Sequence, residues 1–370
     1  MIRTPLCEEL GIEVPIFAFT PSEHVAAAVS RAGGLGVLGC VRFNDPEELD
    51  RTLDWLDDNT DGKPYGVDVV MPMKIPTEGT SVDLKAMIPP EHVSFVERTL
   101  QQLGVPPLPD EGDERREGVL GWLHSVARSH VDIALGHRPV LIANALGSPP
   151  VDVIEQAHAA GVQVAALAGA AKHALSHVAN GVDIIVAQGY EAGGHTGEIA
   201  SMVLTPEIVD AVGPAVPVLG AGGIGSGRQM AASLALGAQG VWTGSIWLGT
   251  EEYQHLNTNR GMTEAFLAAS SADTVRTRVY TGKPARLLKT KWTDAWETDD
   301  APAPLPMPLQ NLLVSDAHQR MSAHGDPEVI SIPIGQIVGR MDEVRPVADV
   351  MADLVSGFEG TVDRLGEMRG

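Results

Sequence analysis

Eight short apolar segments recur along the 370-residue chain and constrain its fold more than any other feature of the sequence. Each is bounded by Gly or Pro and followed by a stretch with helical spacing, a pattern typical of parallel strands buried on both faces. Eight strand–helix repeats predict an α/β fold, specifically a closed (β/α)8 or TIM barrel. The expected strands are Pro15–Phe19, Leu35–Gly39, Tyr65–Val70, Val140–Ala145, Val162–Leu167, Val182–Ala187, Val216–Gly220 and Gly240–Leu248.

The spacing of polar and glycine residues places helices between these strands. Ser22 is expected to cap a helix through Val25 and Val29, which ends at the glycine pair Gly33 and Gly34. Further helices are expected at Asp152–Ala160, Lys172–Asn180 and Arg228–Leu236.

Two segments depart from the repeat. The connection 71–138 is too long for a simple crossover and predicts an inserted helical cap over the barrel mouth, with helices at Glu91–Leu103 and Val119–Leu135 around the acidic, Pro-containing stretch Pro106–Glu117. The second segment follows Tyr253 and contains the Pro-rich run Ala301–Pro308 and a charged amphipathic helix near Val347–Leu365. We therefore expect a barrel over 1–252 and a C-terminal extension over 253–370 that packs on it, with a possible homodimer formed through the last helix.

Composition excludes several classes of function. The chain has 26 Lys and Arg against 48 Asp and Glu, a formal net charge of −22 that disfavours nucleic acid and anionic membranes as partners. Its two cysteines, Cys7 and Cys40, lack a CxxC spacing, so neither a disulfide framework nor a metal site is indicated. The first residues lack the apolar core of a signal peptide and no apolar run reaches about 18 residues, so we expect a protein that is neither exported nor membrane-spanning. A cytoplasmic enzyme acting on a small molecule is the expectation.

Glycines follow the seventh and eighth expected strands, where barrel enzymes commonly bind phosphate. The run Ala221–Gly227 reads AGGIGSG, and Trp242–Ser245 reads WTGS. Glycine lets backbone N–H groups approach a phosphate, so Gly222, Gly223, Gly244 and Ser245 predict a phosphate cradle. A tight turn without a ligand is the simpler alternative. A dinucleotide fingerprint is disfavoured because the run follows the seventh strand of a series.

The string Gln188–Gly197 follows the sixth strand and reads QGYEAGGHTG. Glycines on both sides predict an accessible His195, whose imidazole could remove a proton or hold an oxyanion near neutral pH. A purely structural histidine in the loop is the alternative. A solvated helix face is expected for His173 and His177, and the same for His24, His92, His158, His318 and His324.

Two acidic residues and one cysteine lie in or beside the apolar strands. Asp68 lies near the carboxyl end of the third strand, where it could contact a cofactor, since a buried carboxylate otherwise needs a partner. Asp183 opens the sixth strand at the opposite end and is expected to be structural. Cys40 is expected to serve packing.

The strings AGGLGVLG (Ala32–Gly39), AQGYEAGGHTG (Ala187–Gly197) and GAGGIGSGRQMAASLALGAQGVWTGS (Gly220–Ser245) resemble the nitronate monooxygenase family, formerly 2-nitropropane dioxygenases. The resemblance covers most of 1–252. It implies an FMN-dependent barrel that oxidises alkyl nitronates with O2 to a carbonyl compound and nitrite. It also implies that His195 is the catalytic histidine. The residues implied to bind FMN are Gln188, Gly193 and Gly194 at the flavin, and Gly222, Gly223, Trp242, Thr243, Gly244 and Ser245 near the phosphate.

Two positions depart from the family pattern. Many members have a Pro-Met element after the first strand, where this chain has Ala18, Phe19 and Thr20, which we keep as expected cofactor contacts. Members commonly have an Asn where this chain has Asp68. An ionised carboxylate there would lower the flavin potential.

Two other functions remain compatible with the sequence. The EAGGH and GGI strings also resemble FMN-type enoyl-acyl-carrier-protein reductases, which favours an NAD(P)H-dependent reductase of enoyl thioesters or quinones as the main alternative. The other alternative is a non-catalytic protein that binds FMN and recruits a partner through its Pro-rich segment.

Overall fold

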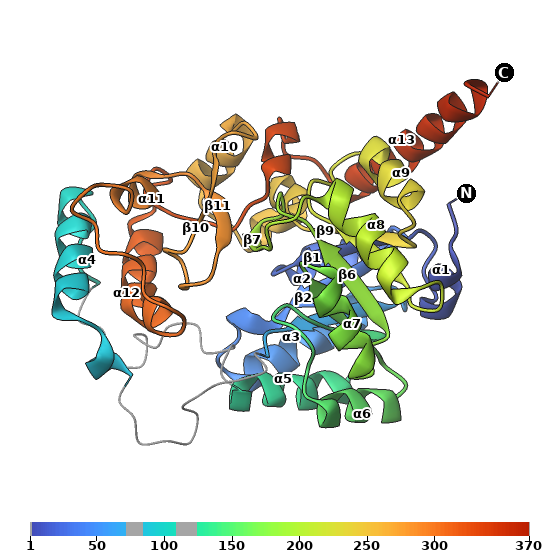
Figure 1. The fold of residues 1–370 in the computed structure, drawn as a ribbon, viewed down its shortest axis with the longest axis horizontal. Coiled ribbons are helices and arrows are strands. Elements are labelled where there is room, and N and C mark those ends of the chain that lie inside the picture. The colour runs from blue at the N-terminus through green and yellow to red at the C-terminus, as the bar shows by residue number, and fades with distance from the viewer. Residues whose placement is uncertain (1, 72–83, 109–123, 370) are drawn as a thin grey trace.

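A closed barrel of eight parallel strands forms the body of the molecule (Figure 1). The computed structural model describes residues 2–71, 84–108 and 124–369. The strand order is β1-β2-β3-β4-β5-β6-β8-β9, and β9 pairs with β1 to close the ring. The barrel strands are β1 (Ile16–Thr20), β2 (Leu35–Gly39), β3 (Tyr65–Val69), β4 (Leu141–Asn144), β5 (Gln163–Ala168), β6 (Ile184–Gln188), β8 (Val218–Ala221) and β9 (Gly240–Thr243). All eight predicted strands are thus confirmed, although the last ends at Thr243 because Gly244 leads into a short 3-10 helix, Ser245–Gly249.

Helices cover the outside of the barrel. Ser22 caps α2 as predicted, since its hydroxyl accepts the N–H of Val25 at 3.4 Å, and Gly33 follows the helix with φ +87°. The wall helices that lie between consecutive strands are α2 (Glu23–Arg31), α3 (Pro46–Asn59), α5 (His124–Gly136), α6 (Val151–Ala159), α7 (Ala171–Ala179), α8 (Ser201–Val212) and α9 (Gly227–Ala235).

The last wall helix is α13 (Val347–Glu367), which lies beside α9 (Figure 1) and also packs against α2. It therefore occupies the place of the helix that normally follows the eighth strand, although residues 244–346 intervene. Its fit against α9 depends on Gly227, where an added Cβ would overlap the backbone of Gly357 and Phe358. The predicted C-terminal extension thus supplies part of the barrel wall.

Side chains alternate between the two faces of each barrel strand. The interior is filled by a cluster that includes Phe17, Val37 and Trp242. The short helix α1 (Pro5–Leu10) adds Leu6 and Leu10 to this cluster and closes the amino-terminal end of the barrel. The opposite end, at which all eight strands terminate, is left for loops.

Residues outside the ring form a cap beside the barrel. Its elements are α4 (Pro90–Gln102), α10 (Arg260–Ala268), β10 (Thr274–Thr277), β11 (Ala285–Leu288), α11 (Lys291–Ala295) and α12 (Leu309–His324). An apolar core of its own joins α4 to the later elements and includes Phe95, Trp292 and Val314. Arg320 of α12, which is 6% exposed, ion-pairs with Glu97 of α4 at 3.0 Å.

The structure divides the predicted 71–138 insertion. Only its first helix joins the cap, whereas α5 packs against α3 and β3 as a wall helix. Most of the acidic stretch Pro106–Glu117 lies outside the described residues, so coverage of the mouth by this stretch stays a prediction. No described helix is both long and apolar enough to cross a membrane.

Gly227→Ala tests the fit of α13 against α9. The added methyl would meet helix backbone that cannot move as a flexible side chain can, so we expect a loss of about 1–3 kcal/mol in the free energy of unfolding, measured by urea denaturation. Gly360→Ala is the matched control in exposed α13, where an added Cβ meets no atom within 4 Å. It should be neutral or stabilise by up to about 1 kcal/mol. Equal losses in both variants would contradict this packing.

Candidate active site

The residues expected at the cofactor gather at the carboxyl ends of the barrel strands, but their side chains divide between its two faces. Strand alternation directs Phe19, Asp68, Gln188 and Trp242 inward. The rings of Phe19 and Trp242 stack with centroids 6.3 Å apart.

Three other expected contacts have outward side chains. Ala18 packs in the cluster beneath α2 and α13. The hydroxyl of Thr20 accepts the N–H of Ser22 at 3.1 Å, and that of Thr243 donates to the carbonyl of Phe17 at 3.0 Å. Only the backbone of these three residues is therefore available to a cofactor.

The glycine loops after β8 and β9 present free backbone amides. The N–H groups of Gly222, Gly223, Gly244 and Ser245 donate to no acceptor in the described part of the chain. Gly222 and Gly223 have φ of +94° and +70°, which few other residues adopt. Unpaired amides at neighbouring strand ends fit a phosphate group well. These residues are the ones that would hold a phosphate-bearing cofactor.

The adjoining helix α9 contributes less to this cradle than its position suggests. Its amino terminus is already capped, because the hydroxyl of Ser226 accepts the N–H of Gln229. The Gln229 side chain in turn accepts the N–H of Gly225 at 3.0 Å. The loop amides, more than the helix terminus, are therefore left for an anion.

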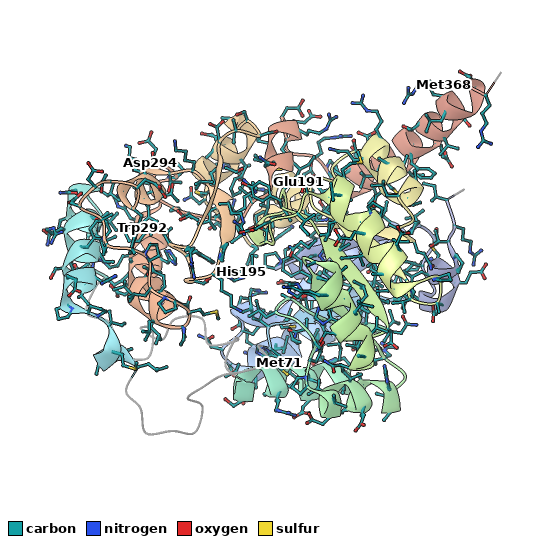
Figure 2. The ribbon with its side chains drawn as sticks, in the orientation of Figure 1. Met71, Glu191, His195, Trp292, Asp294 and Met368 are labelled. Carbon is teal, nitrogen blue, oxygen red and sulfur yellow. The ribbon has the colours of Figure 1, made fainter. Side chains whose placement is uncertain are left out.

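His195 lies on β7 (Gly194–His195), a two-residue strand that pairs antiparallel with β11 of the cap. Ala285 is the register partner of His195, and Arg286 that of Gly194. Figure 2 shows His195 where the barrel meets the cap. The side chain is partly buried, so the expectation of a freely accessible histidine is wrong. The cap covers what the glycines alone would have left open.

Thr281, in the turn between β10 and β11, contacts the imidazole directly. Its Oγ1 lies 2.6 Å from His195 Nε2 and also accepts the N–H of Lys283 at 3.4 Å. The Nδ1 atom of His195 has no partner among the described residues, so it is the nitrogen left for a substrate. Burial, followed by the charge of Lys283, lowers the pKa of His195 to about 4, which keeps the imidazole neutral at pH 7.

Two arginines of the cap hairpin hold the loop that carries His195. Arg276 donates to the hydroxyl and carbonyl of Thr196, both at 3.1 Å. Arg286, only 2% exposed, donates to the carbonyl of Tyr190 at 3.1 and 3.2 Å and lies over its ring. Hydrogen bonds from charged donors are stronger than neutral ones, so these contacts fix a loop that its glycines would leave flexible.

A second cap segment, near Gly335, contacts both the histidine loop and the phosphate cradle. The N–H of Gly335 donates to Ser245 Oγ at 2.8 Å, and that of Gln336 to the carbonyl of Glu191 at 3.0 Å. A Cβ at Gly193 would lie 2.8 Å from the Gly335 nitrogen. The close approach of the Gly335 backbone therefore explains why position 193 is a glycine at least as well as the predicted flavin contact does.

Sequence reasoning missed Thr281, Arg276, Arg286 and Gly335. The alternation of Val275, Thr277 and Val279 before a Gly-Lys-Pro turn could have indicated a hairpin. Nothing local in the sequence pairs that hairpin with β7.

Several other side chains are structural. Cys40 and Asp183 serve packing and structure, as predicted: Cys40 is fully buried, and Asp183 accepts the N–H of Val164 at 2.8 Å. The solvated face expected for His177 is wrong, because its ring is buried between Ser148 and the carbonyl of Leu167. The same expectation is wrong for His92, which is buried, and for His318, whose ring packs against Tyr280 and Trp292 with its Nε2 atom buried. Within the described ranges, no group of three His, Cys, Asp or Glu side chains could bind a metal ion.

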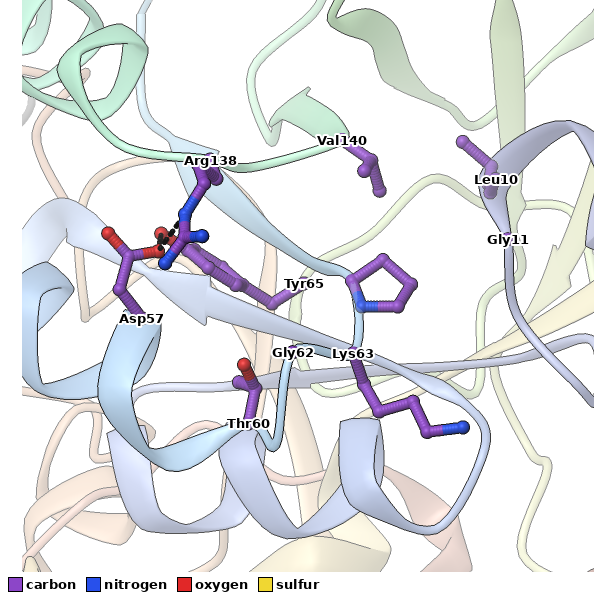
Figure 3. Close-up of a pocket in the computed structure, with 10 residues that line it drawn as sticks. Leu10, Gly11, Asp57, Thr60, Gly62, Lys63, Tyr65, Arg138 and Val140 are labelled. Carbon is purple, nitrogen blue, oxygen red and sulfur yellow. Dashed lines mark hydrogen bonds and ion pairs between the residues drawn. The ribbon is translucent and has the colours of Figure 1, made fainter.

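A cavity of about 240 Å³ opens at the other end of the barrel (Figure 3). Its lining residues come from the end of α1 and from the segments that lead into β3 and β4. Asp57 in its wall accepts the hydroxyl of Tyr65 at 3.0 Å and lies 3.7 Å from Arg138. Asp57 and Arg138 already neutralise one another, and the amino-terminal end of a barrel usually serves stability. This cavity is therefore interpreted as part of a structural region.

Known proteins resemble the whole chain, cap included. The family model of nitronate monooxygenases matches residues 4–357. The chain belongs to the nitronate monooxygenase family. With that membership, the chain is a flavin-dependent oxidoreductase.

Individual relatives cover nearly the full length. A Mycobacterium tuberculosis protein named "Putative monooxygenase Rv1533" is 49% identical over 100% of this chain and 99% of its own. A "Probable nitronate monooxygenase" of Staphylococcus aureus is 27% identical over 96% and 97%. Among solved structures, a nitroalkane oxidase from Streptomyces ansochromogenes aligns with TM-score 0.79 and 25% identity over 97% and 99%. FabK from Thermotoga maritima aligns with TM-score 0.75 and 27% identity over the whole of both chains.

Lys283→Gln tests the electrostatics of His195. Burial is the larger cause of the low His195 pKa and Lys283 the smaller, so removal of Lys283 should raise that pKa above about 4 while burial keeps it below its usual value, and the imidazolium should form at higher pH. NMR titration of the histidine ring protons, with His195→Gln for assignment, measures the shift. Lys289→Gln is the control, because Lys289 pairs with Asp294 and does not perturb His195. A wild-type His195 pKa near 6.5 would contradict this account.

Proposed function

We propose that this enzyme is an FMN-dependent nitronate monooxygenase that oxidises alkyl nitronates with O2 to a carbonyl compound and nitrite. The observation that carries the proposal is the neutral, Thr281-bound His195 at the same barrel end as the unpaired glycine amides. The chemistry that bound FMN would supply is the uptake of electrons from the nitronate and their transfer to O2. The amides of Gly222, Gly223, Gly244 and Ser245 would hold its phosphate, and the inward residues Phe19, Asp68, Gln188 and Trp242 would adjoin its ring.

His195 is proposed to orient the substrate by a hydrogen bond. A histidine whose pKa is about 4 is a weak base toward the C–H of a neutral nitroalkane. If the Thr281 hydroxyl donates to Nε2, the proton of the neutral ring lies on Nδ1, which then donates to an anionic nitronate oxygen. The depressed pKa therefore favours nitronates over nitroalkanes as substrates.

A reductase of enoyl thioesters or quinones that uses NAD(P)H is the second candidate. The Gly-rich strings shared with that class support it. An enoyl reductase domain from Bacillus amyloliquefaciens, at TM-score 0.67 and 13% identity, shares the fold alone. A non-catalytic flavoprotein is the weakest candidate, because Thr281, Arg276 and Arg286 of the cap hairpin hold the His195 loop in place.

Anaerobic titration of the purified yellow protein separates these candidates. We expect propyl nitronate to bleach the visible flavin absorbance within the time of one catalytic cycle. NADPH should leave the absorbance unchanged. Bleaching by NADPH alone would establish the reductase, and bleaching by neither donor the non-catalytic protein.

His195→Ala, which removes the donor, should retain bound flavin and lose about 10²-fold or more in kcat with propyl nitronate. The flavin spectrum and the stoichiometry of FMN per chain serve as controls for folding. Full turnover in the variant would remove His195 from the mechanism.

Thr281 is proposed as a positioning residue that acts through His195. Thr281→Val removes the hydroxyl and should lower kcat/KM about tenfold, as expected for one lost hydrogen bond. Thr281→Ser keeps the hydroxyl and should restore most of the activity. The 15N shifts of His195 report which nitrogen carries the proton, and they should change in the Val variant but not in the Ser variant. An unchanged proton position in the Val variant would contradict the assignment.

A further inference from the structure

The Asp68 carboxyl group lies inside the barrel at its carboxyl end. On β3, Tyr65, Val67 and Val69 pack outward in the cluster formed with α3 and α5, so alternation directs Asp68 inward. Its register partners are Gly39 on β2 and Ala143 on β4, and neither has a polar side chain. Nothing on the two flanking strands therefore compensates a charge at this position.

Asp68 is 2% exposed, and its carboxyl group bonds to no described residue. The titratable group beside it is the Cys40 thiol, whose pKa is raised first by burial and then by Asp68, so this thiol is neutral. Arg42, just beyond Cys40, is already paired with Glu23 at 2.9 Å and Glu48 at 3.4 Å. A carboxylate here would be a buried charge without a counter-ion, which is strongly unfavourable.

We propose that Asp68 is a neutral carboxylic acid whose hydroxyl donates a hydrogen bond to an acceptor atom of the flavin ring. This inference rests on the flavin of the proposed function and on the inward position of Asp68 at the barrel end that carries the free glycine amides. A protonated acid has one donor to satisfy, and the ring edge of a flavin offers carbonyl and nitrogen acceptors. Asp68 would then add no negative charge to the cofactor site.

Protonation of Asp68 has a consequence for the protein without cofactor. Burial raises the pKa of Asp68 well above its usual value. The unfolded chain loses this proton near pH 4 while the folded chain retains it, so wild-type stability falls as pH rises from about 4 through the folded pKa. Asp68→Asn cannot ionise, so its stability relative to wild type should increase from pH 4.5 to pH 8.

The deciding experiment compares wild type with Asp68→Asn and Asp68→Leu. Infrared difference spectra at pH 7, taken as wild-type holoenzyme minus each variant holoenzyme, should contain the carbonyl stretch of a protonated carboxylic acid. This band belongs to the wild type and should be absent from both variants. Asp68→Asn keeps a donor of the same shape, so its dissociation constant for FMN and its flavin potential should stay close to wild type from pH 6 to pH 8. Asp68→Leu has no donor and should bind FMN about tenfold more weakly.

Two outcomes would overturn the proposal. If no such band is present, or if Asp68→Asn binds FMN at least tenfold more tightly, the group is ionised. If the band is present but Asp68→Leu binds FMN as tightly as wild type, the acid does not contact the flavin. None of these measurements uses a nitronate, so their results do not depend on whether the substrate titration identifies a nitronate monooxygenase.

Discussion

The antiparallel pairing of β7 with β11 joins the barrel to the cap at the position of His195. The loop between β6 and α8 contains Gly189, Gly193, Gly194 and Gly197, and a loop of this composition has little rigidity of its own. Its order comes from the hairpin, through two register pairs and the arginine hydrogen bonds to Tyr190 and Thr196. The geometry of the histidine therefore depends on the folding of the cap as much as on the barrel.

Several polar groups at this end of the barrel carry no charge. The backbone amides after β8 and β9 are uncharged, burial keeps His195 neutral, and burial also raises the pKa of Asp68. Lys283 adds the positive charge that lowers the pKa of His195. In a chain whose net charge is −22, the proposed neutral Asp68 would add no local repulsion of an anionic substrate.

Most of the fold could be predicted from local patterns in the sequence. The eight strands and the capped helix α2 were predictable because apolar runs and glycine spacing are properties of neighbouring residues. The glycines after β8 and β9 were predictable for the same reason. The role of α13 was not, because the helix that completes the wall lies beyond 244–346 in the chain.

Long-range contacts also explain what was missed in the site. Thr281 lies 86 residues from His195 in sequence, and its hydroxyl is in a turn with no pattern that links it to the EAGGH string. The burial of His177 could not be predicted because its two partners come from separate loops and strands. Which face of a helix is solvated is decided by its neighbours, and they are known only after the topology is known.

The late position of α13 bears on how the protein is made. A ribosome completes all eight barrel strands before the helix that packs beside α9 and α2 has been synthesised. Until then the apolar surface that α13 covers, including Val29 and Met230, has no partner of its own chain to pack against. The nascent barrel should therefore need protection from aggregation during this interval.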